Sequence, residues 1–129
     1  MKFDYLFFEG RFLPIVPLKI KGKDGWIEFK AFIDTGASYC LFHADEAEVL
    51  GIELEKGEKD EMIVGDGNAL TVYIHHLTIS IAGKEFQAKI GFSKGIGVNM
   101  DIIGRKDIFN NFVVCFDEQE NSVTFTPKK

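Results

Sequence analysis

The 129-residue sequence has few of the residues that build disulfide scaffolds or metal sites. Its only cysteines, Cys40 and Cys115, are far from the spacing of paired metal ligands. We therefore expect two buried free thiols rather than a disulfide. His75 and His76 are adjacent, so in a strand their side chains point to opposite faces and cannot readily share a metal ion. The sequence thus predicts no metal site.

Long apolar runs and concentrated positive charge are also absent. No run approaches the roughly 20 residues that span a bilayer, and Glu9 interrupts any signal-peptide core near the N-terminus. The 15 Lys and Arg residues are scattered among 20 Asp and Glu residues, for a formal net charge of −5. Nucleic-acid binding needs a basic cluster instead. We expect no membrane, no nucleic-acid partner and a cytoplasmic location.

The sequence does contain short apolar runs separated by turn residues, a pattern typical of an all-β domain. Strands are expected over residues 12–21, 26–33, 39–42, 77–81, 85–92, 112–117 and 122–126, and a hairpin is expected around 65–68. Short helices are expected over 43–50, closed by Gly51, and over 105–111. The length and the ordinary globular composition predict one domain over residues 1–129.

The two halves of the chain follow a similar plan of strand, turn, strand, loop and helix. Each loop carries a marked tripeptide, Asp34-Thr35-Gly36 in the first half and Ile102-Ile103-Gly104 in the second. We expect residues 34–36 and 102–104 to lie in adjacent, equivalent places within a pseudo-twofold arrangement. Taken alone, each tripeptide has a purely structural explanation. Asp-Thr-Gly is common in turns, and Ile-Ile-Gly is typical of the end of a core strand.

Three motifs together resemble the retroviral-type aspartic proteases, the retropepsins. Asp34-Thr35-Gly36-Ala37-Ser38 is similar to their active-site signature, and Ile102-Ile103-Gly104-Arg105 is similar to their second signature. Gly65-Asp66-Gly67 lies between the two, where the family has its substrate-covering flap. The resemblance covers most of residues 14–112. It implies a retropepsin-like acid protease fold, a closed β-rich single lobe with one or two short helices and a flap hairpin.

The resemblance also implies a homodimeric aspartic endopeptidase. In such an enzyme one carboxylate activates a water while a second, protonated carboxyl donates to the substrate. Two carboxyls roughly 3 Å apart share one proton. Because this chain offers one such acid, the second Asp34 has to come from a twofold-related copy. The substrate is expected to be an extended polypeptide bound as a strand, and no cofactor is implied.

Residue roles follow from the same resemblance. The catalytic group is Asp34, Thr35 and Gly36, in which the Gly36 N–H donates to the carboxylate and Thr35 reaches the partner's loop. The expected substrate-binding residues are Ala37, Ser38, Gly65, Asp66 and Gly67, and the expected support of the site is Ile102, Ile103, Gly104 and Arg105. Ala37 carries no hydroxyl, whereas pepsin-like relatives have Ser at this position. The charged form of the two paired aspartates therefore has one hydrogen-bond donor fewer, which leaves the pair less acidic and predicts a mildly acidic pH optimum.

Three positions depart from the family's pattern. Ser38 stands where many retroviral members have an Asp that pairs with the Arg matching Arg105, so Arg105 needs another acceptor. Cys40 replaces a common Thr, and Asp66 replaces an apolar residue at the flap tip, which suggests altered flap contacts or polar or basic substrates. These changes leave open a catalytically inactive, dimeric peptide-binding or assembly module. A chain that is monomeric and inert until its local concentration rises is a third alternative.

Overall fold

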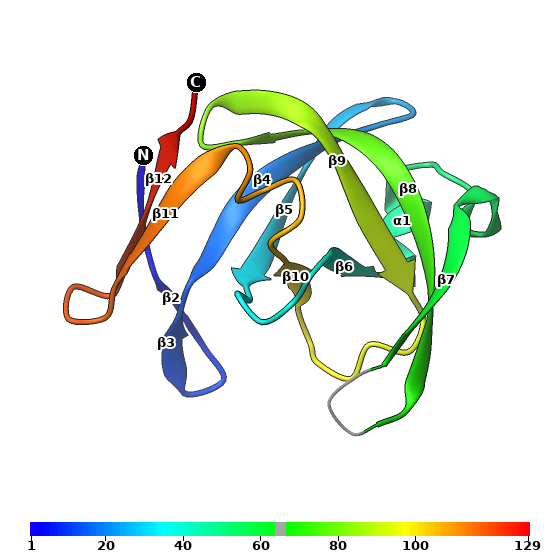
Figure 1. Ribbon diagram of the computed structural model, residues 1–129, viewed down its shortest axis with the longest axis horizontal. Coiled ribbons are helices and arrows are strands. Elements are labelled where there is room, and N and C mark those ends of the chain that lie inside the picture. Colours follow the sequence, from blue (N-terminus) through cyan, green and yellow to red (C-terminus); the bar gives the residue numbers. More distant parts are fainter. Residues whose placement is uncertain (64–66) are drawn as a thin grey trace.

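The computed structural model describes residues 1–63 and 67–129, which form an all-β lobe with one short α-helix (Figure 1). The strands are β1 (Lys2–Asp4), β2 (Leu6–Phe8), β3 (Arg11–Leu13), β4 (Ile15–Gly22), β5 (Gly25–Ile33), β6 (Cys40–His43), β7 (Glu58–Ile63), β8 (Ala69–Ile81), β9 (Lys84–Ser93), β10 (Asp101–Ile103), β11 (Phe112–Asp117) and β12 (Ser122–Pro127). The helices are α1 (Ala44–Val49) and a 3-10 turn at Leu54–Lys56. No helix in this part of the chain is long and apolar enough to cross a bilayer.

The main sheet closes on itself. Its strand order is β4-β5-β10-β6-β9-β8-β7, and β4 also pairs with β8, so the strands from β4 to β8 form a closed circuit with β7 attached outside. Closure removes most free sheet edges, which otherwise attract other chains. The predicted closed β-rich lobe is confirmed.

The alternating pattern of the strands fills the interior of this circuit. Val16, Leu18 and Ile20 of β4 point inward and are buried, because side chains alternate between the two faces of a strand. Phe42 packs edge-to-face on both Phe29 and Phe92, with ring centroids 5.6 and 6.1 Å apart. Burial of each such side chain contributes about 1.5–3 kcal/mol.

A second sheet joins the two ends of the chain. Its order is β1-β12-β11, and both termini lie beside it on the left of Figure 1. The expected strand over residues 12–21 is divided between β3 and β4, and β2 pairs with β3 in a separate hairpin. That hairpin leaves Phe7 and Phe12 exposed, with their rings 5.2 Å apart.

The two tripeptides predicted to be neighbours do lie side by side. β10 runs parallel to β5, with Ile103 opposite Ile33. One residue beyond, the Asp34 N–H donates to the Ile103 carbonyl at 2.9 Å. The expected adjacency of residues 34–36 and 102–104 is therefore confirmed.

The helix predicted over residues 105–111 is wrong. Asp107 has a φ of 68°, in the left-handed region, and only one α-type hydrogen bond forms, from the Phe109 N–H to the Arg105 carbonyl. The Asn110 Oδ1 accepts from the Asp107 N–H, and the Asn111 side chain donates to the Asp107 carbonyl. Side chains thus satisfy backbone groups that a helix would have paired.

Two other expectations need correction. β8 runs without a break from Ala69 to Ile81, so the hairpin arm and the strand expected at 77–81 are one element. Cys40 is buried as predicted, but Cys115 is exposed on β11, an edge strand with few buried positions. Helix α1 agrees with the expected helix over 43–50, and Gly51 follows it with a φ of 75°.

Candidate active site

Asp34 is the first residue after β5, where the strand gives way to a tight turn. The Gly36 N–H donates to its Oδ1 at 2.9 Å, as expected from the sequence. The Ala37 N–H donates to its carbonyl at 3.1 Å. A β-carbon on Gly36 would lie 3.3 Å from Oδ1, so this glycine permits the close approach. The carboxyl group is therefore held in one orientation by its own loop.

This carboxyl group lines a cleft of about 820 Å³. The cleft lies between the loop after β5, the β7–β8 hairpin and the loop after β9. Its lining residues are Asp34, Gly36, Ala37, Ser38, Tyr39, Leu41, Met62, Ile63, Leu70, Gly95, Ile96, Gly97, Val98 and Ile102. Most of them are apolar, so the cleft suits apolar side chains of a bound molecule.

The segment that follows β10 packs against the loop that begins at Asp34 and supports it through backbone hydrogen bonds. The Arg105 N–H donates to the Ala37 carbonyl at 3.0 Å, and the Lys106 N–H donates to the Ser38 carbonyl at 2.8 Å. Gly104 sits so near this loop that a β-carbon would come within 2.3 Å of the Tyr39 carbonyl oxygen. The residues predicted as support thus hold the loop through backbone contacts.

The structure separates the two isoleucines of the second motif. Ile103 is fully buried in the core, whereas Ile102 is half-buried and lines the cleft. Successive side chains of a strand point to opposite faces, which explains the difference. Ile102 therefore contributes to the cleft as well as to its support.

Of the predicted substrate-binding residues, Ala37 and Ser38 line the cleft. Gly67 is exposed, with a φ of 86°. Gly65 and Asp66 lie outside the described residues. The lining residues that the sequence reasoning missed are Tyr39, Leu41, Met62, Ile63, Leu70 and residues 95–98. Residues 95–98 could have been noticed from their glycine-rich composition. The other lining residues look like ordinary strand residues in the sequence, because they come together only when the main sheet closes.

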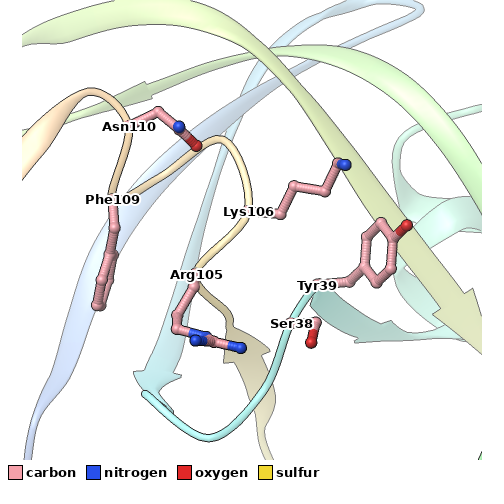
Figure 2. Close-up of a pocket in the computed structure, with 6 residues that line it drawn as sticks. All are labelled: Ser38, Tyr39, Arg105, Lys106, Phe109 and Asn110. Atoms are coloured by element: carbon pink, nitrogen blue, oxygen red, sulfur yellow. The ribbon is translucent and has the colours of Figure 1, made fainter.

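A second cavity, of about 550 Å³, opens beside the cleft (Figure 2). Ser38, Tyr39, Arg105, Lys106, Phe109 and Asn110 line it, and the first two also line the cleft. The Lys106 Nζ lies 5.5 Å from the centroid of the Tyr39 ring, within the range of a cation–π contact. In the part of the chain that the structure describes, the one ion pair joins Lys56 and Glu53, so Arg105 has no acidic partner there.

A pair of carboxyl groups links α1 to the start of β10. Asp101 is buried, accepts the His43 N–H at 2.9 Å and is hydrogen-bonded to Glu46. Burial, the hydrogen bond and the nearby charge of Asp101 raise the pKa of Glu46 to about 7. Burial also raises the pKa of Asp101, against the opposing effect of the hydrogen bonds from Glu46 and His43. The pair therefore favours a shared proton, and its Asp101 lies three residues before Gly104.

No group of three His, Cys, Asp or Glu side chains is arranged to hold a metal ion within residues 1–63 and 67–129. His75 is engaged elsewhere, since its Nε2 lies 3.0 Å from the Leu54 carbonyl oxygen. Its ring also packs edge-to-face on Phe92.

Comparisons with known proteins agree with this fold. A sequence profile described as aspartyl protease matches residues 16–92, more than half of the chain. The chain therefore belongs to the aspartyl protease family, and its resemblance to the retropepsins is confirmed. A comparison with curated protein sequences returned no match.

Two solved structures show the same fold. A retropepsin-like aspartic protease from Rickettsia conorii is similar with a TM-score of 0.70 and 18% sequence identity, over 97% of this chain and 90% of that one. EIAV protease, in complex with the inhibitor HBY-793, is similar with a TM-score of 0.56 and 19% identity, over 78% of this chain and 88% of that one. The likeness covers a larger share of the chain than the profile match does.

Proposed function

We propose that this chain is one half of a homodimeric aspartic endopeptidase, with residues 1–129 forming a single catalytic domain. The observation that carries the proposal is the placement of Asp34, whose carboxyl group is held by the Gly36 N–H and lines an apolar cleft. Membership of the aspartyl protease family supports the same reaction class. Asp34, Thr35 and Gly36 are the proposed catalytic residues.

In this reaction the two Asp34 carboxyls of a dimer share one proton. The ionised carboxylate takes a proton from water as the water oxygen attacks the peptide carbonyl carbon. The protonated carboxyl donates to the carbonyl oxygen, which gives a tetrahedral intermediate. When the C–N bond breaks, one carboxyl of the pair protonates the leaving nitrogen while the other carboxylate takes a proton from a hydroxyl of the intermediate, so the pair again shares one proton. No covalent enzyme intermediate forms and no cofactor takes part.

The shape of the cleft supports an extended peptide as substrate. One wall is the β7–β8 hairpin, which contributes Met62, Ile63 and Leu70. A peptide laid as a strand places alternate side chains toward opposite walls. We propose that the segment around Gly65, Asp66 and Gly67 acts as the flap over this peptide, together with Ala37 and Ser38 at the floor.

The need for two copies follows from the chemistry of the pair. One chain brings a single Asp34 to its cleft, whereas the reaction needs an acid and a base. Thr35 is exposed at the tip of the loop and is free to contact the matching loop of a second copy. A twofold interface would place the two loops on the symmetry axis.

The test compares the wild type with Asp34→Asn on a peptide library. The amide keeps the size of the side chain but cannot act as the base, so cleavage should fall by about 10²–10⁴-fold or more. Asp45→Asn, an exposed substitution on α1, is the matched control and should cleave as the wild type does. Sedimentation over a dilution series should show a dimer whose dissociation parallels the loss of activity.

The second candidate is a peptide-binding or assembly module that uses the same cleft without turnover. The departures at Ser38, Cys40 and Asp66 favour it over a fully conventional enzyme. Equal and negligible cleavage by wild type and Asp34→Asn, with retained peptide binding, would leave this second function alone.

A further inference from the structure

The cavity beside the cleft is positively charged, which is unusual in this acidic protein. Among the described residues its lining includes Arg105 and Lys106 but no Asp or Glu, although the chain as a whole has a formal net charge of −5. Both cations are exposed. Figure 2 shows the Arg105 side chain extending toward the loop that bears Ser38, and Lys106 on the same side of the cavity as Tyr39.

Two acids that are near lining residues in the sequence, Asp107 beside Lys106 and Asp34 before Ser38, accept backbone N–H groups and form no ion pair with either cation. The Asp107 Oδ2 accepts the Lys89 N–H at 2.8 Å, and the Asp34 Oδ1 accepts the Gly36 N–H at 2.9 Å. Ser38, which faces Arg105 across the cavity mouth, carries no charge. Within the part of the chain that the structure describes, the planar guanidinium of Arg105 therefore keeps its paired donors available, in the geometry that matches a carboxylate.

The cavity adjoins the cleft. Ser38 and Tyr39 line both, and they follow Asp34 by four and five residues in the same loop. A peptide strand advances about 3.3 Å per residue, so a substrate whose scissile bond lies at Asp34 passes the cavity mouth within a few residues. The aromatic rings of Tyr39 and Phe109 can pack against the aliphatic part of a bound side chain, and Asn110 adds a neutral hydrogen-bond donor.

We propose that this cavity is a specificity subsite for an acidic side chain of the peptide substrate, with glutamate as the best fit. Arg105 binds the carboxylate through paired N–H donors, and Lys106 adds a second positive charge. The inference rests on the proposed function, because it assumes that the cleft holds a peptide. It also gives Arg105 an acceptor that residues 1–63 and 67–129 do not supply.

The test uses a set of fluorescent peptides that carry either Glu or Gln at each position near a cleavage site. Binding is measured by anisotropy on the Asp34→Asn chain, which removes turnover, and kcat/KM is measured on the wild type. At one position the Glu peptide should bind about tenfold more tightly, a ratio that corresponds to 1.4 kcal/mol. The preference should weaken as salt is raised, because both cations are exposed.

Variants then assign the preference to the cavity. Arg105→Gln and Lys106→Gln, each placed in the Asp34→Asn background, should lower the Glu-to-Gln ratio toward one, and Lys106→Glu should favour a Lys peptide instead. Lys21→Gln removes an exposed cation of β4 that does not line the cavity, and it should leave the ratio as it was. Circular dichroism confirms that each variant is folded.

The outcomes separate this inference from the proposed function. A preference for Glu in binding without cleavage by the wild type would retain the subsite and reject the protease. A wild type that cleaves Glu and Gln peptides equally at every position would reject the subsite and retain the protease. A ratio that survives both Gln variants would also overturn the subsite. If Arg105→Gln instead weakens the dimer and leaves the ratio unchanged, the acceptor of Arg105 belongs to a second copy, and the subsite is again rejected.

Discussion

Gly104 packs directly on the backbone of Tyr39. A β-carbon at this position would lie 2.3 Å from the Tyr39 carbonyl oxygen and 2.9 Å from the Ala37 carbonyl oxygen. Backbone atoms cannot move aside as a flexible side chain does. The approach of the two loops therefore depends on the absence of a side chain at residue 104, and it sets the position of the loop that begins at Asp34.

Gly104→Ala should accordingly displace the loop and lower both stability and activity. Overpacking of this kind costs about 1–3 kcal/mol in the free energy of unfolding. Urea titration measures the stability and peptide cleavage measures the activity. Gly97→Ala is the control for stability, because a β-carbon there meets no atom within 4 Å. Equal stability of the two variants would show that the loop adapts without cost.

The Glu46 and Asp101 pair predicts that stability depends on pH. The pKa of Glu46 is raised from 4.5 to about 7 in the fold, so the folded state binds a proton more tightly than the unfolded chain does. The stabilisation is complete below about pH 4.5 and is lost as the pH rises through 7. The raised pKa of Asp101 acts in the same direction.

Glu46→Gln should flatten this dependence, because the amide can donate to Asp101 at every pH. The measurement is the free energy of unfolding between pH 4.5 and 8 for both proteins. His43 and Asp45 are the other titratable groups whose charge acts on Glu46, the first lowering its pKa and the second raising it. Asp45→Asn is therefore a control that should retain most of the slope. Parallel curves for wild type and Glu46→Gln would contradict the prediction.

The aromatic cluster inside the barrel predicts a large difference between two phenylalanines. Phe42 is fully buried between Phe29 and Phe92, so Phe42→Ala should destabilise the fold by about 3–5 kcal/mol. Phe7, which is 66% exposed on the β2–β3 hairpin, provides the matched control. Phe7→Ala should change the free energy of unfolding by less than about 1 kcal/mol. Similar losses for both would indicate that the hairpin is buried in the assembled protein.

The two cysteines should differ in their reaction with a thiol reagent. Burial raises the pKa of Cys40 to about 12, and no surface of this side chain is exposed. Cys115 is exposed on β11. One thiol per chain should react at once in the native protein at pH 8, and the second should react only on unfolding. Cys115→Ser should abolish the fast phase, and a fast phase that remains would place Cys40 within reach of solvent.

The sequence was sufficient to predict the elements that depend on local pattern. The run of residues 26–33 has the alternation of a half-buried strand, and the structure has β5 there. Asp-Thr-Gly contains its own turn, since the Gly36 N–H and the Asp34 carboxyl are only two residues apart. The adjacency of residues 34–36 and 102–104 was also accessible, through the repeated plan of the two halves.

Other features were beyond any local pattern. The segment 105–111 has the composition of a short helix, yet Asp107 adopts a left-handed conformation while its carboxylate binds the Lys89 N–H of β9. That contact exists only after β9 has been placed. The exposure of Cys115 likewise depends on β11 lying at a sheet edge, which the sequence does not encode within the strand itself.

The sequence by itself determined the strand-forming pattern and the turn that presents Asp34, because both depend on interactions between residues close together in the chain. The cleft, the basic cavity and the carboxyl pair were decided only by the tertiary structure. Ser38 and Arg105 are separated by about half of the chain, and they line one cavity because β10 pairs with both β5 and β6. Such contacts arise from the closure of the sheet, which no short stretch of sequence contains.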